Sequence, residues 1–439
     1  MSAESKVSGA PLVDEDTHPP PTEPRHAMLE PNANIPLYEG RMRVAGSEGT
    51  EGHGTVFLRW LPTPRIEFEI PSVRLFGTFG DCKLELLDVG RSCDAAVTSR
   101  GNGGLKGLVD RVGRVPGANP RVDRLQLHIP NFRRTRGEPL SHPNGDGWFS
   151  GRIRVEVQEW RLTLDKMAPK MHEALNATGG FGFTHVLVCE RRDGAQFDPA
   201  SADDFLHVLD AGLSFCLGRW TGCVLGTGYA SGTVVWEDWR LPWLSSHGSN
   251  STWFVDYPGS AVEGLLPAFV RAFEDPVRGR ALRNCVHWYI EANAGHGGLE
   301  GAIIMALVAL ELLAWLEFVN GGGESPDDFD REPAHSKIRR YLAAKGIALQ
   351  FPTDADLVDL VPFTSANHLA DGVEAVTRIR NRSVHPPKKT GFEDYSIELR
   401  EQAWRYSLHL LERAILAEVG YKGHMHDRTR RGWPCIVVP

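Results

Sequence analysis

The stretch Thr377-Arg378-Ile379-Arg380-Asn381-Arg382-Ser383-Val384-His385-Pro386-Pro387 closes a segment with helical periodicity that begins near Asn367. Two consecutive prolines end this helix, because proline lacks the backbone N–H and disfavours the α conformation of the residue before it. At 100° per residue, the apolar residues that fall within roughly 40° of Arg380 are Leu369, Val373, Val376 and Val384. Arg380 is therefore expected along the apolar seam of its helix. An always-charged guanidinium there needs an anionic partner, either a carboxylate or a bound phosphate.

One acidic residue is a candidate partner for Arg380. Glu311 is the lone charge between Gly301 and Trp315, inside an apolar helix expected at residues 299–319. A carboxylate in a helix suited to a bundle interior needs a cation or hydrogen-bond donors. We therefore expect Glu311 to pair with Arg380 or to lie close to it. The pair could support a functional site, or it could only fix the register of the bundle.

The second part of the chain has helical periodicity throughout. Helices are expected at residues 265–273, 280–294, 299–319, 336–344, 367–384 and 395–419. The most apolar of them is interrupted by Glu311 and Glu317, which favours a bundle helix over a membrane span. We predict a helical bundle over residues 261–439.

The region before the bundle has short apolar alternations separated by Gly, Pro, Asn and Asp, which is typical of strands. Strands are expected at residues 55–60, 65–70, 83–87, 124–129 and 184–189. Within residues 151–164 the apolar positions change parity, from Ile153, Val155 and Val157 to Trp160, Leu162 and Leu164. A β-bulge near Gln158 and Glu159 would return both sets to one face of a long strand. The predicted fold class is α+β, with a β-rich domain at residues 36–260 ahead of the helical bundle.

Composition limits the protein class. Residues 1–35 are rich in Pro, Glu, Asp and Ser, so a disordered tail is predicted there. A formal net charge of −8 argues against a chain coated in nucleic acid, although it allows a local basic site. Seven cysteines without paired spacing suit reduced thiols, and the first residues lack a signal-peptide pattern. We expect a cytoplasmic protein that does not bind a membrane.

Two further groups of residues have alternative interpretations. The tryptophans Trp220, Trp236, Trp239, Trp243 and Trp253 could stack on bases or sugars, but a place in the core or at a domain seam is favoured. The loop arginines Arg133, Arg134 and Arg136 could contact phosphates, with a solvated loop as the default. The basic residues near the C-terminus, expected on a solvated face, are Lys422, Arg428, Arg430 and Arg431.

The order Arg380-Asn381 followed by His385 in a helical bundle resembles the motif of the HEPN superfamily. The likeness covers roughly residues 261–420. Within it, Trp288-Tyr289-Ile290-Glu291-Ala292, Gly301-Ala302-Ile303-Ile304 and Ala309-Leu310-Glu311-Leu312-Leu313 are similar to HEPN domains of ApeA-type phage-defence proteins. Those proteins also place a separate domain ahead of the bundle. The resemblance implies a metal-independent endoribonuclease that needs no cofactor, acts in antiviral defence or a toxin-like response, and works as a homodimer whose motifs face one another.

The resemblance also assigns roles by position. Arg380 would bind the scissile phosphate, Asn381 would orient it, and His385 would act as acid or base in attack by the RNA 2′-hydroxyl. Glu311 would support Arg380, and the expected RNA contacts are Arg378, Arg382, Lys388 and Lys389. No metal ligand set is expected, since the group His424, His426 and Asp427 is more simply incidental. The alternative is a non-catalytic HEPN module that binds nucleotide, RNA or protein, with the β-rich domain as a ligand sensor.

Overall fold

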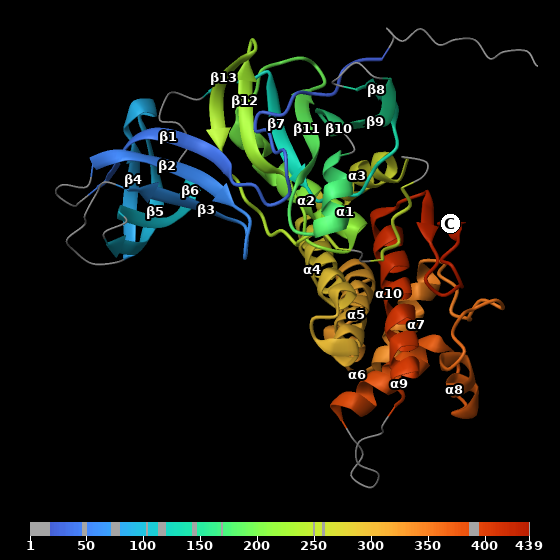
Figure 1. Cartoon of the computed structure of the whole chain (residues 1–439). Helices are drawn as coiled ribbons and strands as arrows, with labels where there is room; N and C mark the ends of the chain where they lie inside the picture. The colour runs from blue at the N-terminus through green and yellow to red at the C-terminus, as the bar shows by residue number, and fades with distance from the viewer. Residues whose placement is uncertain are drawn as a thin grey trace, which may run out of the picture.

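The computed structural model describes residues 18–45, 51–71, 80–101, 104–112, 120–142, 147–167, 170–248, 251–256, 260–385 and 395–438. The chain contains a closed β-barrel, a larger open sheet with helices packed against it, and a bundle of helices that extends away from the sheet (Figure 1). The predicted α+β class, with β-structure first and helices second, is confirmed.

The first unit is a six-stranded antiparallel barrel with the order β1-β2-β3-β6-β5-β4, in which β4 pairs with β1. Its strands are β1 (Ile35–Val44), β2 (Glu51–Arg59), β3 (Arg65–Ile70), β4 (Gly80–Leu86), β5 (Arg91–Gly101) and β6 (Gly104–Val112), with a 3-10 turn η2 (Leu87–Val89). Strand β3 shows why they close. Ile66, Phe68 and Ile70 are buried at every second position, so one apolar face points into the barrel.

The second unit is a seven-stranded antiparallel sheet with the order β13-β12-β7-β11-β10-β9-β8. Its strands are β7 (Arg124–Pro130), β8 (Glu138–Ser141), β9 (Trp148–Val157), β10 (Trp160–Lys166), β11 (Phe183–Arg191), β12 (Val224–Ala230) and β13 (Thr233–Asp238). Between them the chain forms α1 (Lys170–Thr178), a 3-10 turn η3 (Pro199–Ala202) and α2 (Asp203–Leu217). Leucines of α2 and of α3 (Ser260–Phe273) pack on one face of this sheet.

The change of parity within residues 151–164 has a different cause from the predicted bulge. Residues 158 and 159 form a turn between β9 and β10, and Gln158 adopts a positive φ of 52° there. Val157 pairs with Trp160, Val155 with Leu162, and Ile153 with Leu164. Directly opposed residues share a face, so a two-residue hairpin unites both apolar sets without a bulge.

The segment from residue 18 to residue 34 is ordered, which corrects the predicted disordered tail in this part. The backbone N–H and hydroxyl of Thr22 both donate to Asp165, at 2.7 and 2.8 Å. Gln126 donates to the carbonyl of Glu23 at 2.8 Å, and Met28 is buried. Hydrogen bonds with polar side chains of the sheet thus hold this segment in place, although its own composition predicts disorder. Residues 1–17 of the predicted tail lie outside the described residues.

The helical part confirms the expected helices, except that the helix expected from residue 367 begins only at Gly372. It contains α3, α4 (Pro276–Ala294), α5 (Gly298–Trp315) with a π-helical extension η4 (Leu316–Gly321), α6 (Pro326–Arg331), α7 (Ala334–Ala344), α8 (Leu360–Ala366), α9 (Gly372–Val384) and α10 (Ile397–Val419). A short hairpin of β14 (His424–His426) and β15 (Cys435–Val437) follows α10. Asp275 and Ser396 cap α4 and α10, because their side chains accept backbone N–H groups that have no partner within the first turn of a helix.

Helix α5 and its extension form the one stretch among the described residues that is long and apolar enough to cross a membrane by length and composition. Half of its most apolar window is buried, and it packs against α4, α7, α9 and α10. In this structure it is therefore a bundle helix, as its two glutamates indicate.

The boundary predicted at residue 260 separates strands from helices but does not separate two cores. One continuous apolar core joins the seven-stranded sheet, α2 and all the longer helices. The barrel has a second core, which includes Trp60 packed between Phe181 and Phe183 of the sheet unit. This second core continues into α1, β11 and β12, so the two cores meet within the sheet unit.

Four of the five tryptophans confirm the favoured interpretation, since Trp220 is partly buried against the core and donates to Glu291 of α4 at 3.1 Å. Trp236, Trp239 and Trp253 are buried, and the indole N–H of Trp253 donates to the carbonyl of Phe215 in α2 at 3.1 Å. By contrast, Trp243 is exposed.

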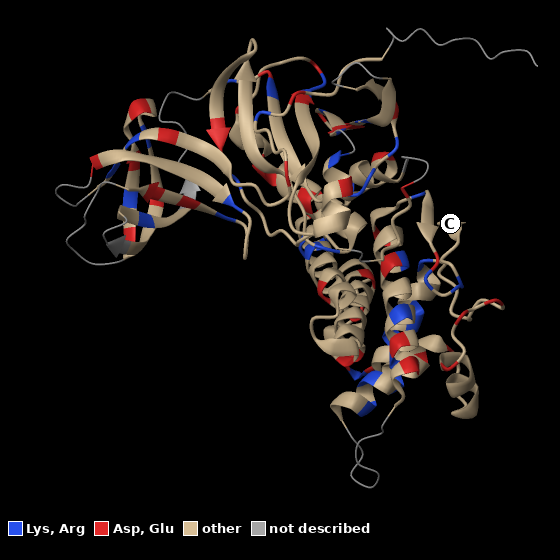
Figure 2. Ribbon diagram, viewed as in Figure 1, with Lys and Arg blue, Asp and Glu red and all other residues tan. Residues whose placement is uncertain are grey.

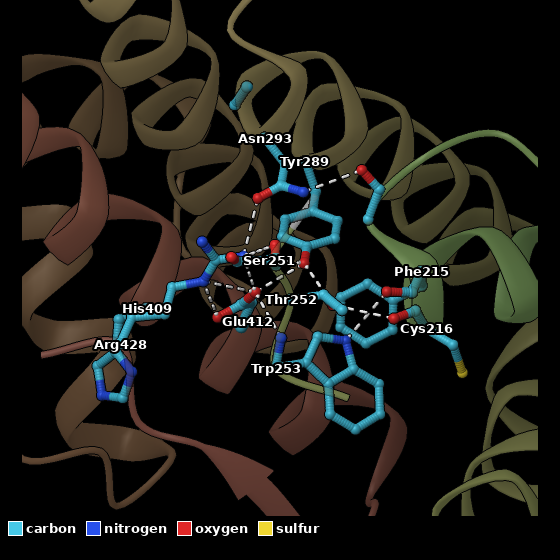
Figure 3. Close-up of polar contacts among 12 residues, drawn as sticks. Phe215, Cys216, Ser251, Thr252, Trp253, Tyr289, Asn293, His409, Glu412 and Arg428 are labelled. Carbon is cyan, nitrogen blue, oxygen red and sulfur yellow. Dashed lines mark hydrogen bonds and ion pairs between the residues drawn. The ribbon is translucent and has the colours of Figure 1, made fainter. Parts of the chain in front are cut away.

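A buried ion pair connects the sheet unit to the bundle (Figure 3). Arg428 and Glu412 of α10 are 1% and 0% exposed, and the Nη2–Oε1 distance is 2.7 Å. Arg428 also donates to the carbonyl of Ser251 and to the side chain of Asn293 in α4, at 2.9 and 2.8 Å. The expectation that Arg428 lies on a solvated face is wrong, because its acceptors come from three distant segments of the chain.

The environment keeps both buried charges satisfied. Burial alone would lower the pKa of Arg428, but Glu412 and the Tyr289 hydroxyl together outweigh that effect and raise it. Glu412 accepts a further hydrogen bond from the Tyr289 hydroxyl at 2.6 Å and one from the backbone of Trp253 at 3.1 Å. Removing either charge would leave the other uncompensated in the core.

Replacing Glu412 by Gln should lower the free energy of unfolding by about 3–5 kcal/mol, because the buried guanidinium loses its counter-charge. Urea denaturation followed by circular dichroism measures this. The matched control is Glu401→Gln in the same helix, where the carboxylate is 44% exposed and lies 3.8 Å from Arg405. That change should cost less than about 1 kcal/mol. Equal losses in the two variants would contradict a special role for the buried pair.

Candidate functional site

The site predicted from the sequence lies at the C-terminal end of α9. The helix begins after Asp371, whose carboxylate accepts the backbone N–H of Glu374 at 2.9 Å and pairs with Arg339 of α7 at 2.7 Å. It ends at Val384, where the two prolines were expected to stop it. His385 leaves the helix with φ −128° and ψ 75°. Its backbone N–H donates to the carbonyl of Asn381 at 2.7 Å, which closes the last turn and leaves the imidazole beyond it.

The predicted contact between Arg380 and Glu311 is present. Nη2 of Arg380 donates to Oε1 of Glu311 in α5 at 3.1 Å, and Nη1 donates to the side-chain oxygen of Asn381 at 3.0 Å. The two charged side chains are 21% and 26% exposed, so this end of the bundle is half-buried rather than sealed. Two acceptors fix the plane of the guanidinium, which carries five N–H donors in all.

His385 is exposed at the helix end, and Arg380 precedes it by just over one turn of α9. Both side chains can therefore be reached from solvent. A guanidinium can bind a phosphate by charge-assisted hydrogen bonds, and an imidazole can accept or release a proton near neutral pH. The arrangement provides the two chemical functions that RNA cleavage without a metal requires.

The structure describes part of the predicted RNA-binding set. Arg378 and Arg382 lie half-buried on α9, and Figure 2 shows basic positions interleaved with acidic ones around this end of the bundle. Arg400 of α10 forms an ion pair with Glu300 of α5 nearby in the bundle. Lys388 and Lys389 lie outside the described residues.

The residues considered as incidental metal ligands have other contacts. His424 and His426 belong to β14, and Nδ1 of His426 lies 2.8 Å from the carbonyl of Trp433. Asp427 accepts from Thr429 and pairs with Arg430. Among the described ranges of the chain, no group of three His, Cys, Asp or Glu residues is placed to hold a metal ion.

A cleft of about 770 Å³ lies between the barrel and the sheet unit. The barrel contributes Arg65, Asp81 and Ala96 to its lining, and the other wall includes His207 of α2 and Trp236 of β13. The pairing of a barrel with a sheet, which creates this cleft, had no signal in the sequence, because each strand pattern reports only its own buried face.

Comparison with known proteins relates the chain to the YopA families. Residues 117–250 match the YopA central domain, and residues 275–436 match the YopA C-terminal domain. The SPbeta prophage-derived uncharacterized protein YopA of Bacillus subtilis (strain 168) is 27% identical over 319 residues, which cover 71% of this chain and 70% of that protein. No solved structure shows significant similarity. The two matched ranges correspond to the sheet unit and to the bundle from α4 onward.

The Arg380–Glu311 pair, which remains partly open to water, is expected to have a small effect on stability. A double-mutant cycle with Arg380→Gln and Glu311→Gln should give a coupling of less than about 1 kcal/mol in the free energy of unfolding, because water screens the pair. Urea denaturation of the four proteins measures it. A coupling above about 2 kcal/mol would instead indicate that the pair serves mainly to hold α5 against α9.

Proposed function

We propose that the protein is a metal-independent endoribonuclease of the HEPN type, with its site at the end of α9. The observation that carries this proposal is the anchored guanidinium of Arg380, held by Glu311 and Asn381 in the last turns of the helix that ends at the exposed His385. A group that binds phosphate and a group that transfers protons thus share one accessible helix end. RNA supplies its own nucleophile, so these two functions are sufficient for cleavage.

The proposed reaction is an internal transphosphorylation. His385 takes the proton of the 2′-hydroxyl, and the 2′-oxygen forms a bond to the adjacent phosphorus. The bond from phosphorus to the 5′-oxygen breaks, and this oxygen leaves with a proton from water or from a second imidazole. Arg380 stabilises the negative charge that develops on the phosphate oxygens. The products are a 2′,3′-cyclic phosphate and a 5′-hydroxyl.

A homodimer through the bundle is part of the proposal. Helix α5 exposes a half-buried apolar stripe at helical spacing, formed by Ile304, Met305, Val308, Leu312 and Trp315. Glu311 lies on the same stripe, so the stripe is continuous with the Arg380 site. A second copy packed against α5 would cover apolar surface and bring a second His385 toward the first site.

The biological setting is proposed from the resemblance and from one relative. The similar B. subtilis protein is derived from a prophage. We propose that this chain acts against RNA in antiviral defence or in a toxin-like response, in the cytoplasm. A bundle that binds nucleotide, RNA or protein without cleaving it is the alternative.

The cleft between barrel and sheet favours a second function for the β-rich part, namely ligand sensing. Its volume of about 770 Å³ falls in the range of small-molecule sites. Because the sheet shares its core with the bundle, a ligand that changed the cleft would act on elements packed against the helices.

Purified protein should cleave single-stranded or transfer RNA in the presence of EDTA, and His385→Asn should reduce the rate by at least about a hundredfold, because the proton-transfer group is removed. Gel electrophoresis measures cleavage, and mass spectrometry identifies the cyclic phosphate end. Arg380→Gln should have a comparable effect.

Matched controls separate loss of chemistry from loss of fold. His368→Asn changes an exposed imidazole at φ 53°, a backbone conformation that Asn tolerates, and Arg331→Gln changes an exposed arginine of α6. Both controls should cleave RNA like the unaltered protein. Cleavage that persists in both His385→Asn and Arg380→Gln would remove the catalytic assignment and leave the binding module.

Filling the cleft should change the regulation of the protein without touching α9. Ala96→Trp places an indole in the cleft, whereas the control Ala195→Trp adds the same ring at an exposed turn. Induced expression in bacteria, followed as growth, should differ between Ala96→Trp and the unaltered protein, and the control should not differ. Identical growth and identical RNA cleavage in all three proteins would argue against a sensing role for the cleft.

A further inference from the structure

Basic and imidazole side chains gather at the end of the seven-stranded sheet where β10 ends and β11 begins, next to α1. Lys166 is the last residue of β10, His185 lies beside it on β11, and His172 belongs to α1. Arg134 and Arg136 come from the loop between β7 and β8. The sequence alone assigns these arginines to a loop. The fold of the sheet places Lys166 next to that loop.

Lys166 is the central member because its ammonium is buried without a counter-charge. The residue is 9% exposed, and Nζ donates to the backbone carbonyl of Thr135 at 3.2 Å. Nζ also lies 5.6 Å from the centre of the Phe149 ring. Throughout the described part of the chain, Lys166 forms no ion pair with a carboxylate. An ammonium has three donors, so the carbonyl satisfies one of them.

The neighbouring charges add to the positive potential. Burial lowers the pKa of Lys166, and Arg134 and Arg136 lower it further. Arg134 pairs with Glu173 at 3.4 Å, where both side chains are exposed and the attraction is screened. Asp165, the neighbour of Lys166 in β10, is paired with Arg152 instead. Adjacent residues of a strand point to opposite faces, so that carboxylate does not neutralise Lys166.

A second, independent feature is an unsatisfied polar atom in the same cluster. His172 is 3% exposed, and its Nε2 lies 3.1 Å from the carbonyl of Phe132, which requires a proton on Nε2. Burial lowers the pKa of His172 to about 4, so the ring is neutral near pH 7 and its Nδ1 is an acceptor. This buried Nδ1 has no hydrogen-bond partner among the described residues. A ligand that carries an O–H group would satisfy it.

The loop that carries the arginines is held in place before any ligand binds. The backbone N–H of Phe132 donates to Thr184 at 2.9 Å, and that of Gly137 donates to Ser150 at 2.8 Å. Thr135 is buried, and its hydroxyl lies 3.1 Å from Nε2 of His185. A preorganised site loses little conformational entropy on binding.

We propose that Lys166, Arg134 and His172 form a binding site for a phosphate group, presented as free phosphate or as the terminal phosphate of a nucleotide. The ammonium and the guanidinium bind the charged oxygens, and a protonated oxygen of the phosphate donates to His172. A terminal phosphate, which has fewer substituents than an internal phosphate of a polynucleotide backbone, is the better match for a lysine that is only 9% exposed. The site is separate from α9, so it does not depend on the proposed nuclease.

Isothermal titration calorimetry of the full chain with inorganic phosphate, AMP and adenosine, at constant ionic strength, tests the proposal. Phosphate and AMP should bind saturably, and adenosine should not. Tighter binding of AMP than of phosphate would identify a nucleotide as the source. Lys166→Met should weaken binding at least about tenfold, whereas the control Lys83→Met, at an exposed barrel lysine, should leave it unchanged.

The absence of saturable phosphate and AMP binding up to about 10 mM, or equal binding by Lys166→Met and the unaltered protein, would overturn the proposal. If Lys166→Met fails to fold by circular dichroism, two further measurements decide. Arg134→Gln changes an exposed side chain and should also weaken phosphate binding. In the unaltered protein, phosphate should protect Lys166 from acetylation, measured by peptide mass spectrometry with Lys83 as internal reference. Unchanged affinity together with unchanged labelling would refute the site.

Discussion

The buried pair of Arg428 and Glu412 is the contact on which the arrangement of the sheet and the bundle depends. Two unit charges are stable in the interior only if each is fully hydrogen-bonded, and their partners come from α4, α10, the segment before α3 and the end of the chain. These segments are far apart in sequence. The hydrogen bonds of the pair therefore form only when all of these segments reach one point.

The sheet and the bundle share one core, while the barrel shares the second core with α1 and with residues of β11 and β12. The barrel contacts the sheet unit through aromatic rings inside the second core, with Trp60 stacked on Phe181 and edge-on to Phe183. Apolar contacts of this kind adjust more readily than a network of charged hydrogen bonds. The cleft between barrel and sheet is thus the place where a ligand would meet the more adaptable of the two junctions.

The two basic sites differ in how their charge is balanced. Arg380 has a carboxylate within hydrogen-bonding distance, so the free protein is already satisfied there and a substrate phosphate would compete with Glu311. Lys166 has a backbone carbonyl and no paired carboxylate among the described residues. An anion would add a favourable interaction at Lys166 without displacing one. The physical reason to expect a bound ligand is accordingly stronger at the sheet than at the bundle.

The sequence by itself determined the α+β class, most helices and the end of α9 at Val384, because periodicity and proline chemistry act locally. It also determined the partnership of Arg380 with Glu311, because a lone charge in an apolar helix needs a partner. Only the tertiary structure decided the hairpin after Val157, the ordered segment that holds Thr22, and the burial of Arg428. Each of these depends on pairing between distant segments, which a local pattern does not encode.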